Sequence, residues 1–471
     1  MSTAASLWTE QSARRVVQGG IDGLPKLHGT QFLLTGRHFR ESIRGGGRPV
    51  AIGMKVIIIG SGLIGVTSAY FLARRGHDVT VLERADGPGR ETSFANGAML
   101  TAGMAEPWNS PGSWRTLLAS LVRSDAALRL QPKALPSLVG WGITFLRNSG
   151  RATFERNALN ILRLALYSRE AMQSLRQELD IEYGRTARGS LSIFRSGAAL
   201  EHAAAIAGQR AQAGLRFRRL SPAETIALEP GLAPIADRLA GAIHYETDET
   251  GDAYRFCEAL AEKARGLGVN FRFGSDVSAL EAEGGRVVGV ASNGQRFVAD
   301  QYVIAAGSYS TPLLRQVGIN LPVRPAKGYS ITFEDSRERP SLRTPIIDSE
   351  LHAVVVPLDG AVRLAGIAEF AGFDRSLNAT RIHNLTKLLA AVLPRARLDP
   401  ATAKPWCGLR PLSTDGVAVI SPTRLPNLWV NCGQGHLGWT TAAGSAKLMT
   451  SLLSGDAPGI DPAPYALSRF A

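Results

Sequence analysis

Cysteine, acidic residues and long apolar runs are all scarce in this chain of 471 residues. The three cysteines, Cys257, Cys407 and Cys432, are too few and too far apart for a disulfide framework, which favours a reducing, cytoplasmic location. No run of 18 apolar residues occurs, so a membrane-spanning helix is excluded. Hydrophobic residues still make up 45% of the chain and charged residues 20%, which excludes wholesale disorder and indicates a globular protein of roughly three domains.

The shortage of acidic residues leaves a net charge of +13, from 53 Lys and Arg against 40 Asp and Glu. Nucleic acid, acidic lipid headgroups and small anions all fit this balance as partners, and so does an enzyme with an arginine-rich surface. Residues 1–53 hold seven basic and three acidic side chains, show no helical or strand period, and lack the apolar centre of a secretory signal. Because Met54 directly precedes an apolar strand, we interpret residues 1–53 as a basic N-terminal extension, disordered or part of a mis-assigned start, with a targeting role as the alternative.

A dinucleotide-binding pattern begins at Met54. Residues 55–59 predict a buried parallel strand, residues 60–65 read Gly-Ser-Gly-Leu-Ile-Gly, residues 64–75 predict a helix ended by Gly76, and residues 78–82 predict a second strand followed by Glu83. Free N–H groups at the start of the helix suit a pyrophosphate, and Glu83 can accept hydrogen bonds from ribose hydroxyls. The cofactor residues predicted here are Val56, Ile57, Ile58, Ile59, Gly60, Ser61, Gly62, Leu63, Ile64, Gly65 and Glu83.

The residues after Glu83 favour FAD over NAD. Residues 84–90 form a polar loop, and residues 91–98 are small and polar, which suits backbone that wraps around an extended cofactor. A classical NAD domain would continue with regular alternation of strands and helices. We therefore add Arg84, Thr92, Ser93 and Asn96 to the predicted cofactor site.

Three later segments are predicted to return to the same sheet. The first is a helix over 252–265 followed by strands at 269–273, 277–280 and 287–290, the second is a strand at 302–307, and the third is a strand at 428–431 with a glycine turn and a helix over 439–453. Small residues at the strand ends and a second helix N-terminus suit a cofactor. The residues added to the cofactor site are Val277, Ala306, Gly307, Gly433, Gln434, Gly435, His436, Gly438, Trp439 and Thr440.

Six motifs, which follow one another between about residues 54 and 457, resemble those of a known enzyme family. They are VIIIGSGLIGVTSAYFLARRGHDVTVLER, ETSFANGAMLTAG with EPWNSPG, DETGD, PAKGYSITF, WCGLRPLSTDG and NLWVNCGQGHLGWT. The chain resembles the FAD-dependent amine and amino-acid oxidoreductases of the D-amino-acid oxidase superfamily, and most closely the bacterial D-amino-acid dehydrogenase small-subunit family.

The resemblance implies an α/β fold with two domains. A discontinuous Rossmann-like FAD-binding domain would comprise residues 54–110, 240–310 and 405–457. An α+β substrate domain built on an antiparallel sheet would comprise 111–239 and 311–404, with 458–471 left as a C-terminal tail. The implied reaction is oxidative deamination of D-amino acids, such as D-alanine, to 2-oxo acids and ammonia, by hydride transfer from Cα to flavin N5.

Arg410 is the predicted substrate-binding residue. A planar guanidinium suits a substrate carboxylate, and in similar enzymes the arginine of the GLRP motif binds that carboxylate; a structural or surface arginine is the alternative. Tyr329 is predicted to line the pocket, with a core tyrosine as an equal alternative. The family pattern reads Gly-His-Gly where this chain has Gln434, and His436 follows two positions later, so we give neither residue an acid–base role. Cys407 is interpreted as a buried thiol rather than a flavin attachment point, and the scattered histidines show no metal-ligand spacing.

The expected electron acceptor follows from the resemblance alone. The resemblance implies a quinone and peripheral contact with the inner membrane surface. Residues 134–146 are mostly apolar between Lys133 and Arg147, which suits either an interfacial helix or a packed core helix. The alternatives are a D-hydroxyproline dehydrogenase, an oxygen-using oxidase of glycine or sarcosine, and, remotely, an RNA-modifying FAD enzyme. No basic stripe with interleaved aromatics is present, so no nucleic-acid partner is expected.

Overall fold

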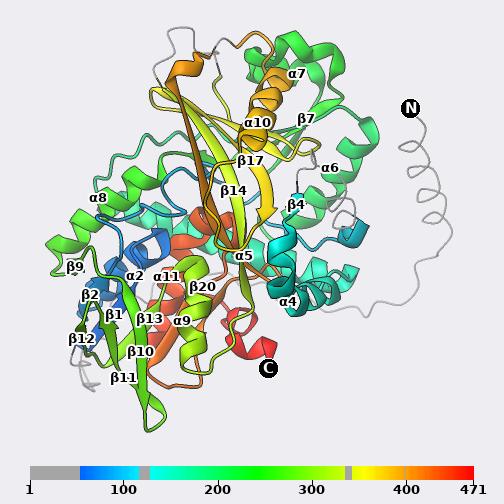
Figure 1. The fold of residues 1–471 in the computed structure, drawn as a ribbon. Coiled ribbons are helices and arrows are strands. Elements are labelled where there is room, and N and C mark those ends of the chain that lie inside the picture. The colour runs from blue at the N-terminus through cyan, green and yellow to red at the C-terminus, as the bar shows by residue number, and fades with distance from the viewer. Residues whose placement is uncertain (1–52, 116–127, 335–341, 397) are drawn as a thin grey trace, which may run out of the picture. The chain divides into compact units, whose positions relative to one another are not determined.

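The computed structural model describes residues 53–115, 128–334, 342–396 and 398–471 (Figure 1). The predicted N-terminal extension lies outside the described residues, except for Gly53. Two large sheets and the helices around them make up the described chain, which confirms the predicted α/β class. Among the described helices, none combines the length and the apolar character needed to cross a bilayer.

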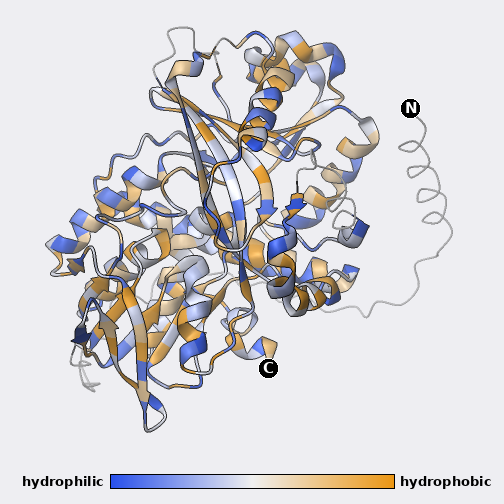
Figure 2. Ribbon diagram, in the orientation of Figure 1, coloured by the Kyte–Doolittle hydropathy of each residue, from blue (hydrophilic) through white to orange (hydrophobic). Residues whose placement is uncertain are grey.

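A six-stranded sheet has the order β19-β20-β13-β1-β2-β9, and only β19 runs antiparallel to its neighbour. The strands are β1 (Lys55–Ile59), β2 (Asp78–Leu82), β9 (Asn270–Arg272), β13 (Gln301–Ile304), β19 (Val419–Pro422) and β20 (Leu428–Cys432). Orange hydrophobic residues predominate along β1 and β13 in Figure 2, as expected for strands that are covered on both faces. The predicted strands at 55–59, 78–82, 302–307 and 428–431 all lie in this sheet.

Helices α2 (Leu63–Arg74), α8 (Ala253–Gly266) and α11 (Gly438–Leu453) lie within about a residue of their predicted bounds. Gly76 adopts a φ of +84° directly after α2, as a helix-ending glycine does. Helix α2 packs against α8 and α11, and α11 packs against α5 (Arg151–Glu178). Helix α2 follows β1 directly and α11 follows β20 through a short turn, so both start beside the ends of strands in the six-stranded sheet.

The prediction that all of these strands join one sheet is wrong for two of them. The strands predicted at 277–280 and 287–290 do not join the six-stranded sheet but form a separate antiparallel sheet, β10-β11-β12. Its strands are β10 (Val277–Glu283), β11 (Arg286–Ser292) and β12 (Gln295–Phe297). The hairpin turn at Gly284 and Gly285, with φ of +57° and +76°, folds β11 back onto β10, so these strands pair with each other.

A nine-stranded, mostly antiparallel sheet has the path β18-β14-β17-β16-β15-β5-β7-β6, with β4 beside β17. Its strands are β4 (Leu128–Leu130), β5 (Ser190–Phe194), β6 (Arg218–Leu220), β7 (Gly241–Tyr245), β14 (Val323–Glu334), β15 (Ile346–Asp348), β16 (Ala353–Leu358), β17 (Ala361–Phe370) and β18 (Ala403–Ser413). Strands β7 and β18 belong to this sheet although their residues fall within the predicted FAD-domain segments 240–310 and 405–457.

The remaining elements connect and cover the sheets. Helix α10 packs on β14, β16 and β17, and a two-stranded sheet pairs β3 with β8. These elements are β3 (Met99–Leu100), β8 (Glu249–Thr250), α4 (Leu135–Arg147), α6 (Gly197–Ala211), α7 (Pro222–Leu228), α9 (Ser310–Gln316), α10 (Ala379–Val392) and the short 3-10 turns η1 (Pro132–Ala134), η2 (Pro230–Arg238), η3 (Gly307–Tyr309), η4 (Pro400–Thr402), η5 (Gly435–Leu437), η6 (Ala463–Tyr465) and η7 (Leu467–Phe470).

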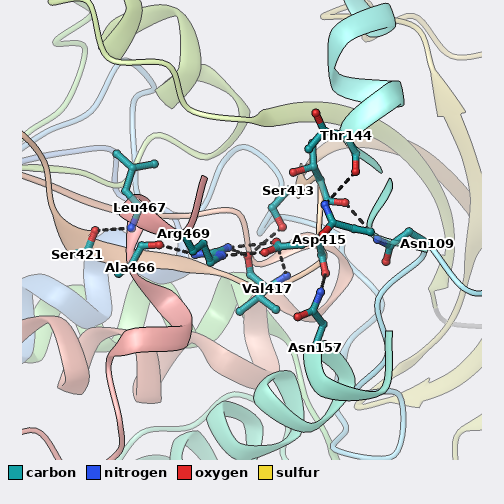
Figure 3. Close-up of polar contacts among 12 residues, drawn as sticks. Asn109, Thr144, Asn157, Ser413, Asp415, Val417, Ser421, Ala466, Leu467 and Arg469 are labelled. Atoms are coloured by element: carbon teal, nitrogen blue, oxygen red, sulfur yellow. Dashed lines mark hydrogen bonds and ion pairs between the residues drawn. The ribbon is translucent and has the colours of Figure 1, made fainter. Parts of the chain in front are cut away.

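The C-terminal residues 458–471, predicted as a tail, pack against the rest of the described chain. Arg469 donates from Nε and Nη2 to the carboxylate of Asp415 at 2.7 and 3.1 Å, and from Nη2 to the carbonyl of Val417 at 2.7 Å (Figure 3). Asn157 contacts the same loop from the other side, through a 3.2 Å hydrogen bond to the carbonyl of Asp415. Because this loop directly follows β18, the last residues of the chain anchor one end of that strand.

Candidate active site

A cavity of about 1920 Å³ runs between the two large sheets of the described chain. Its wall includes Gly60, Glu83 and Thr440 together with Arg410 and Trp108. No group of His, Cys, Asp and Glu side chains within the described ranges is arranged to hold a metal ion. The cavity therefore combines the predicted cofactor residues and the predicted substrate arginine in one continuous space.

The glycine turn after β1 is shaped by close backbone contacts. Gly60 has a φ of +102°, and a Cβ there would lie 2.7 Å from the Ala305 carbonyl oxygen. A Cβ on Gly65 would lie 1.9 Å from the Gly60 carbonyl oxygen, so only glycine lets α2 start this close to the turn. The N-cap, Gly62, offers no side chain, and the first turn of α2 carries no acid. No side chain of the N-cap or acid of the first turn therefore competes with an anionic phosphate at this helix end.

Glu83 is fixed beside the same turn. Its Oε2 accepts hydrogen bonds from the Ser61 amide and hydroxyl at 2.7 and 3.0 Å, and its Oε1 accepts one from the Ala85 amide at 2.9 Å. Ser93 also contacts the turn, because its Oγ accepts a hydrogen bond from the Leu63 amide at 3.1 Å. A carboxylate held in this way can accept further hydrogen bonds from ribose, and its site fits FAD.

Most of the predicted cofactor residues line the cavity, and six do not. Val56, Ile57 and Ile58 are buried within β1. Ser61, Gly65 and Gly433 belong to the glycine turns but do not line the cavity. The lining residues are Ile59, Gly60, Gly62, Leu63, Ile64, Glu83, Arg84, Thr92, Ser93, Asn96, Val277, Ala306, Gly307, Gln434, Gly435, His436, Gly438, Trp439 and Thr440. Sequence reasoning missed Tyr309, whose ring lies 3.8 Å from the Arg84 guanidinium carbon.

Arg410 lies on β18 where the strand pairs with β14. Ala326 pairs with Arg410 and Gly328 pairs with Gly408, so these four residues share one face of the sheet. A Cβ on Gly328 would lie 2.1 Å from Arg410 Nη1 and 2.2 Å from its Cζ. The guanidinium therefore lies flat over Gly328, in space that any side chain at this position would fill.

A β-bulge in the neighbouring strand supplies a contact to this guanidinium. The register of β14 and β17 shifts between Gly328 and Tyr329, which leaves Ile367 as the extra residue of β17. Ile367 has a φ of +56°, which is unfavourable for a β-branched side chain. Its carbonyl accepts a hydrogen bond from Arg410 Nη1 at 3.3 Å. Nothing in the sequence around Ile367 indicates this strained conformation.

The electrostatics of Arg410 favour an anionic ligand. Burial alone lowers the pKa of Arg410 to about 10, and no carboxylate lies within ion-pairing distance of it in the described residues. Its guanidinium carbon lies 5.6 Å from the centre of the Trp108 ring. A buried cation without an anion is costly, and a carboxylate ligand would remove that cost.

Comparison with known proteins decides the family. A family model described as FAD dependent oxidoreductase (DAO) matches residues 55–452. The chain belongs to the DAO family of FAD-dependent oxidoreductases. This membership confirms the predicted family and the predicted cofactor, and the glycine turn, the α2 N-terminus and Glu83 are the groups that would hold FAD.

The relatives of this FAD-dependent oxidoreductase include D-amino acid dehydrogenases. One from Allorhizobium ampelinum and one from Paramagnetospirillum magneticum are each 40% identical over 418 residues, which cover 89% and 88% of this chain and 99% of each relative. Among solved structures, glycine oxidase from Geobacillus kaustophilus gives a TM-score of 0.69 at 23% identity, covering 88% of this chain and 99% of that one. L-proline dehydrogenase from P. horikoshii gives 0.70 at 16% identity, covering 89% and 98%. At these identities the solved structures establish the shared fold.

Tyr329 borders the cavity, as predicted, but its hydroxyl lies on the other face of the sheet from Arg410. It alternates with Gly328 along β14, so its side chain lies on the opposite face of the sheet, among the apolar residues covered by α10. Its hydroxyl donates a hydrogen bond to Glu369 Oε2 at 2.6 Å, and Lys327 lies 4.0 Å from the same carboxylate. Burial, and next the bond to Glu369, raise the pKa of Tyr329. The hydroxyl of Tyr329 therefore belongs to a buried polar network with Glu369 and Lys327 and not to the cavity wall around Arg410.

Cys407 lies on the same far face as Tyr329, with which it pairs across β14 and β18. Its thiol donates to the Arg375 carbonyl at 3.0 Å, and it packs in the apolar core rather than against the cavity. This placement agrees with the interpretation of Cys407 as a core thiol and gives it no approach to a bound flavin.

His436 lies in η5, directly before α11, and borders the cavity near Arg410. Its Nε2 lies 3.2 Å from the Met104 carbonyl oxygen, and its ring stacks on Trp108 with 5.6 Å between ring centres and 27° between planes. Burial, partly offset by the Met104 contact and reinforced by the charge of Arg410, lowers the pKa of His436 to about 4. Trp108 contacts both residues, but its role escaped sequence reasoning although EPWNSPG was recognised as a motif.

Proposed function

We propose that this FAD-dependent oxidoreductase is a D-amino acid dehydrogenase, which oxidises D-amino acids to imino acids that hydrolyse to 2-oxo acids and ammonia. The observation that carries the proposal is the buried guanidinium of Arg410, which pairs with no carboxylate of the described residues and lines the same cavity as the FAD-binding turn. Relatives named D-amino acid dehydrogenase, which share 40% identity over nearly their whole length, support the same reaction.

The residues of the chain would bind and orient the substrate. The five N–H donors of Arg410 match a substrate carboxylate in a bidentate arrangement, while Ala326, Gly328 and Gly408 leave room above the sheet. Bound FAD supplies the hydride acceptor. The ring of Trp108 and the Ile367 carbonyl keep the guanidinium in place, so the carboxylate fixes which face of Cα meets the cofactor.

The test is anaerobic bleaching of the flavin near 450 nm by paired D- and L-amino acids. We expect D-alanine or D-proline to bleach the wild-type protein and their L forms to fail. Arg410→Ala should keep its FAD but bind substrate about two to four powers of ten more weakly, because two charge-assisted hydrogen bonds of roughly 1.5–3 kcal/mol each are lost. Arg410→Lys retains the charge without the planar fork and should fall between the two. Bleaching by L forms alone, or an unimpaired Arg410→Ala, would refute the proposal.

For the electron acceptor we propose a quinone reached at a membrane surface, with α4 as the contact. Leu135, Val139, Ile143 and Leu146 recur at helical spacing and are exposed, with Val139 61% and Ile143 49% exposed. The opposite face of α4 is packed, because Trp141 and Phe145 are buried. An exposed apolar stripe between Lys133 and Arg147 suits an anionic bilayer surface.

Two measurements test this part of the proposal. Reduced enzyme should pass electrons to a soluble quinone analogue and consume little oxygen in its absence. Vesicles containing anionic lipid should sediment the wild-type protein but not a Val139→Glu, Ile143→Glu variant, while Ser137→Glu, which changes a polar exposed position of the same helix, serves as the control. Rapid oxygen use with no response to quinone would favour an oxidase, and equal sedimentation of all three proteins would refute the α4 contact.

A further inference from the structure

His436 stands beside the substrate arginine at a position where the glycine turn departs from the family pattern. We propose that Nδ1 of His436 accepts a hydrogen bond from the amino group of the substrate, so that His436 selects ligands that carry an amine next to the carboxylate. This inference rests on the proposed function, since it assumes that Arg410 binds the carboxylate.

The tautomer of His436 follows from its contacts. With a pKa lowered to about 4 by burial and by Arg410, the imidazole is neutral at pH 7. A neutral imidazole has one N–H donor and one lone-pair acceptor. The Met104 carbonyl oxygen can only accept, so Nε2, 3.2 Å from it, must carry the hydrogen. Nδ1 is therefore the acceptor.

This acceptor is free and fixed in place. None of the described residues forms a hydrogen bond with Nδ1, and His436 is partly open to the cavity. The stack on Trp108 holds the plane of the ring, and the Met104 contact holds one edge. A preorganised acceptor loses little conformational entropy when a ligand binds.

Arg410 and His436 both contact the same indole ring. The Arg410 guanidinium carbon and the His436 ring centre each lie 5.6 Å from the centre of the Trp108 ring. An α-amino acid carries its amine on the carbon next to the carboxylate, and an ammonium group can only donate hydrogen bonds. Since the charge of Arg410 acts on His436, the two lie near each other, and we expect a carboxylate held by Arg410 to bring the amine toward the lone pair of His436. With its low pKa, His436 would orient the amine without removing its proton, which makes it a specificity-determining residue.

Two ligands that the enzyme cannot oxidise allow binding to be measured without the reaction. 2-Aminoisobutyrate has an amine and a carboxylate but no α-hydrogen, and isobutyrate has the same carbon skeleton without the amine. Their equilibrium binding to the FAD-loaded protein is measured by the change in flavin absorbance. We expect the wild-type protein to bind 2-aminoisobutyrate at least about 10-fold more tightly than isobutyrate, as one hydrogen bond to a charged group allows.

Two substitutions of His436 form a matched pair. His436→Gln can still donate to Met104 but lacks an acceptor at the Nδ1 position, whereas His436→Asn places its amide oxygen near that position. We expect His436→Gln to lose the preference for 2-aminoisobutyrate while it still binds isobutyrate and FAD, and His436→Asn to keep most of the preference.

Three outcomes would overturn the inference: no preference in the wild-type protein, an intact preference in His436→Gln, or an equal loss in both variants. A wild-type protein that prefers 2-aminoisobutyrate but is bleached by no D-amino acid would instead refute the proposed function and leave the role of His436 standing.

Discussion

Substituting Gly328 with alanine tests the geometry around Arg410 without touching any charged group. The added Cβ would lie 2.1 Å from Nη1, 2.2 Å from Cζ and 2.4 Å from Nη2 of Arg410. Ordinary van der Waals contact begins at 3.4 Å, so the guanidinium must move by at least 1.3 Å (3.4 − 2.1). Such a movement would also break the 3.3 Å hydrogen bond to the Ile367 carbonyl.

The expected effect of Gly328→Ala follows from that displacement. A misplacement of about 1 Å can reduce catalysis by roughly 100-fold, and bidentate binding of a carboxylate tolerates little change in orientation. We expect kcat/KM for a D-amino acid to fall by about 100-fold, mostly through KM, because the lost contact stabilises bound substrate and transition state alike. Steady-state kinetics with a dye acceptor would measure the change.

The control for this prediction is Gly140→Ala. Gly140 lies in α4, and a Cβ there would meet no atom within 4 Å, so the same chemical change adds no collision. Both variants should bind FAD as the wild-type protein does. If Gly328→Ala keeps a KM within about twofold of the wild-type value, the position assigned to the Arg410 guanidinium is wrong.

Three further predictions concern stability. Tyr329→Phe leaves Glu369 without its 2.6 Å donor and should lower the free energy of unfolding in urea by about 1–3 kcal/mol, while kcat changes little; a large loss of kcat would restore Tyr329 to the active site. Arg469→Ala breaks the mostly buried pair with Asp415 and should cost about 3 kcal/mol, measured in the same way, and an unchanged unfolding midpoint would show that the C-terminal contact contributes nothing. Burial raises the pKa of Asp248 from 3.8 to about 6, so the folded state holds this proton more tightly than the unfolded state. Its contribution to stability is therefore complete below pH 3.8 and falls by about 3 kcal/mol as pH rises to 6, and Asp248→Asn should lack this slope when unfolding is compared at pH 4.5 and 7.

The cofactor half of the site could be predicted because its signals are local. One strand, one glycine turn, one helix and one acid follow each other within residues 55–83, and the observed bounds of α2 agree with the prediction to about one residue. The place of Arg410 in the cavity wall was also predictable, because the family resemblance includes the GLRP motif. Neither prediction required knowledge of which distant segments pair.

The substrate half depends on pairing between distant strands. Gly328 makes room for Arg410 only because β14 lies beside β18, and Ile367 reaches the guanidinium only through a bulge in β17. The sequence of β14 does contain one usable signal, since the small residues Ala326, Gly328 and Ser330 alternate with large ones. That alternation places the large residue Tyr329 on the other face, which agrees with the alternative of a core tyrosine that the sequence left open.

The central place of β1 has a consequence for how the protein is made. Its partner β13 is synthesised some 240 residues later, and β20 later still, so the sheet cannot close while the nascent chain is still short. The strand that carries Arg410, β18, is likewise synthesised long after β1. Capture of the flavin nucleotide should accordingly wait for β20, and ribosome-bound chains that stop before residue 428 should remain colourless.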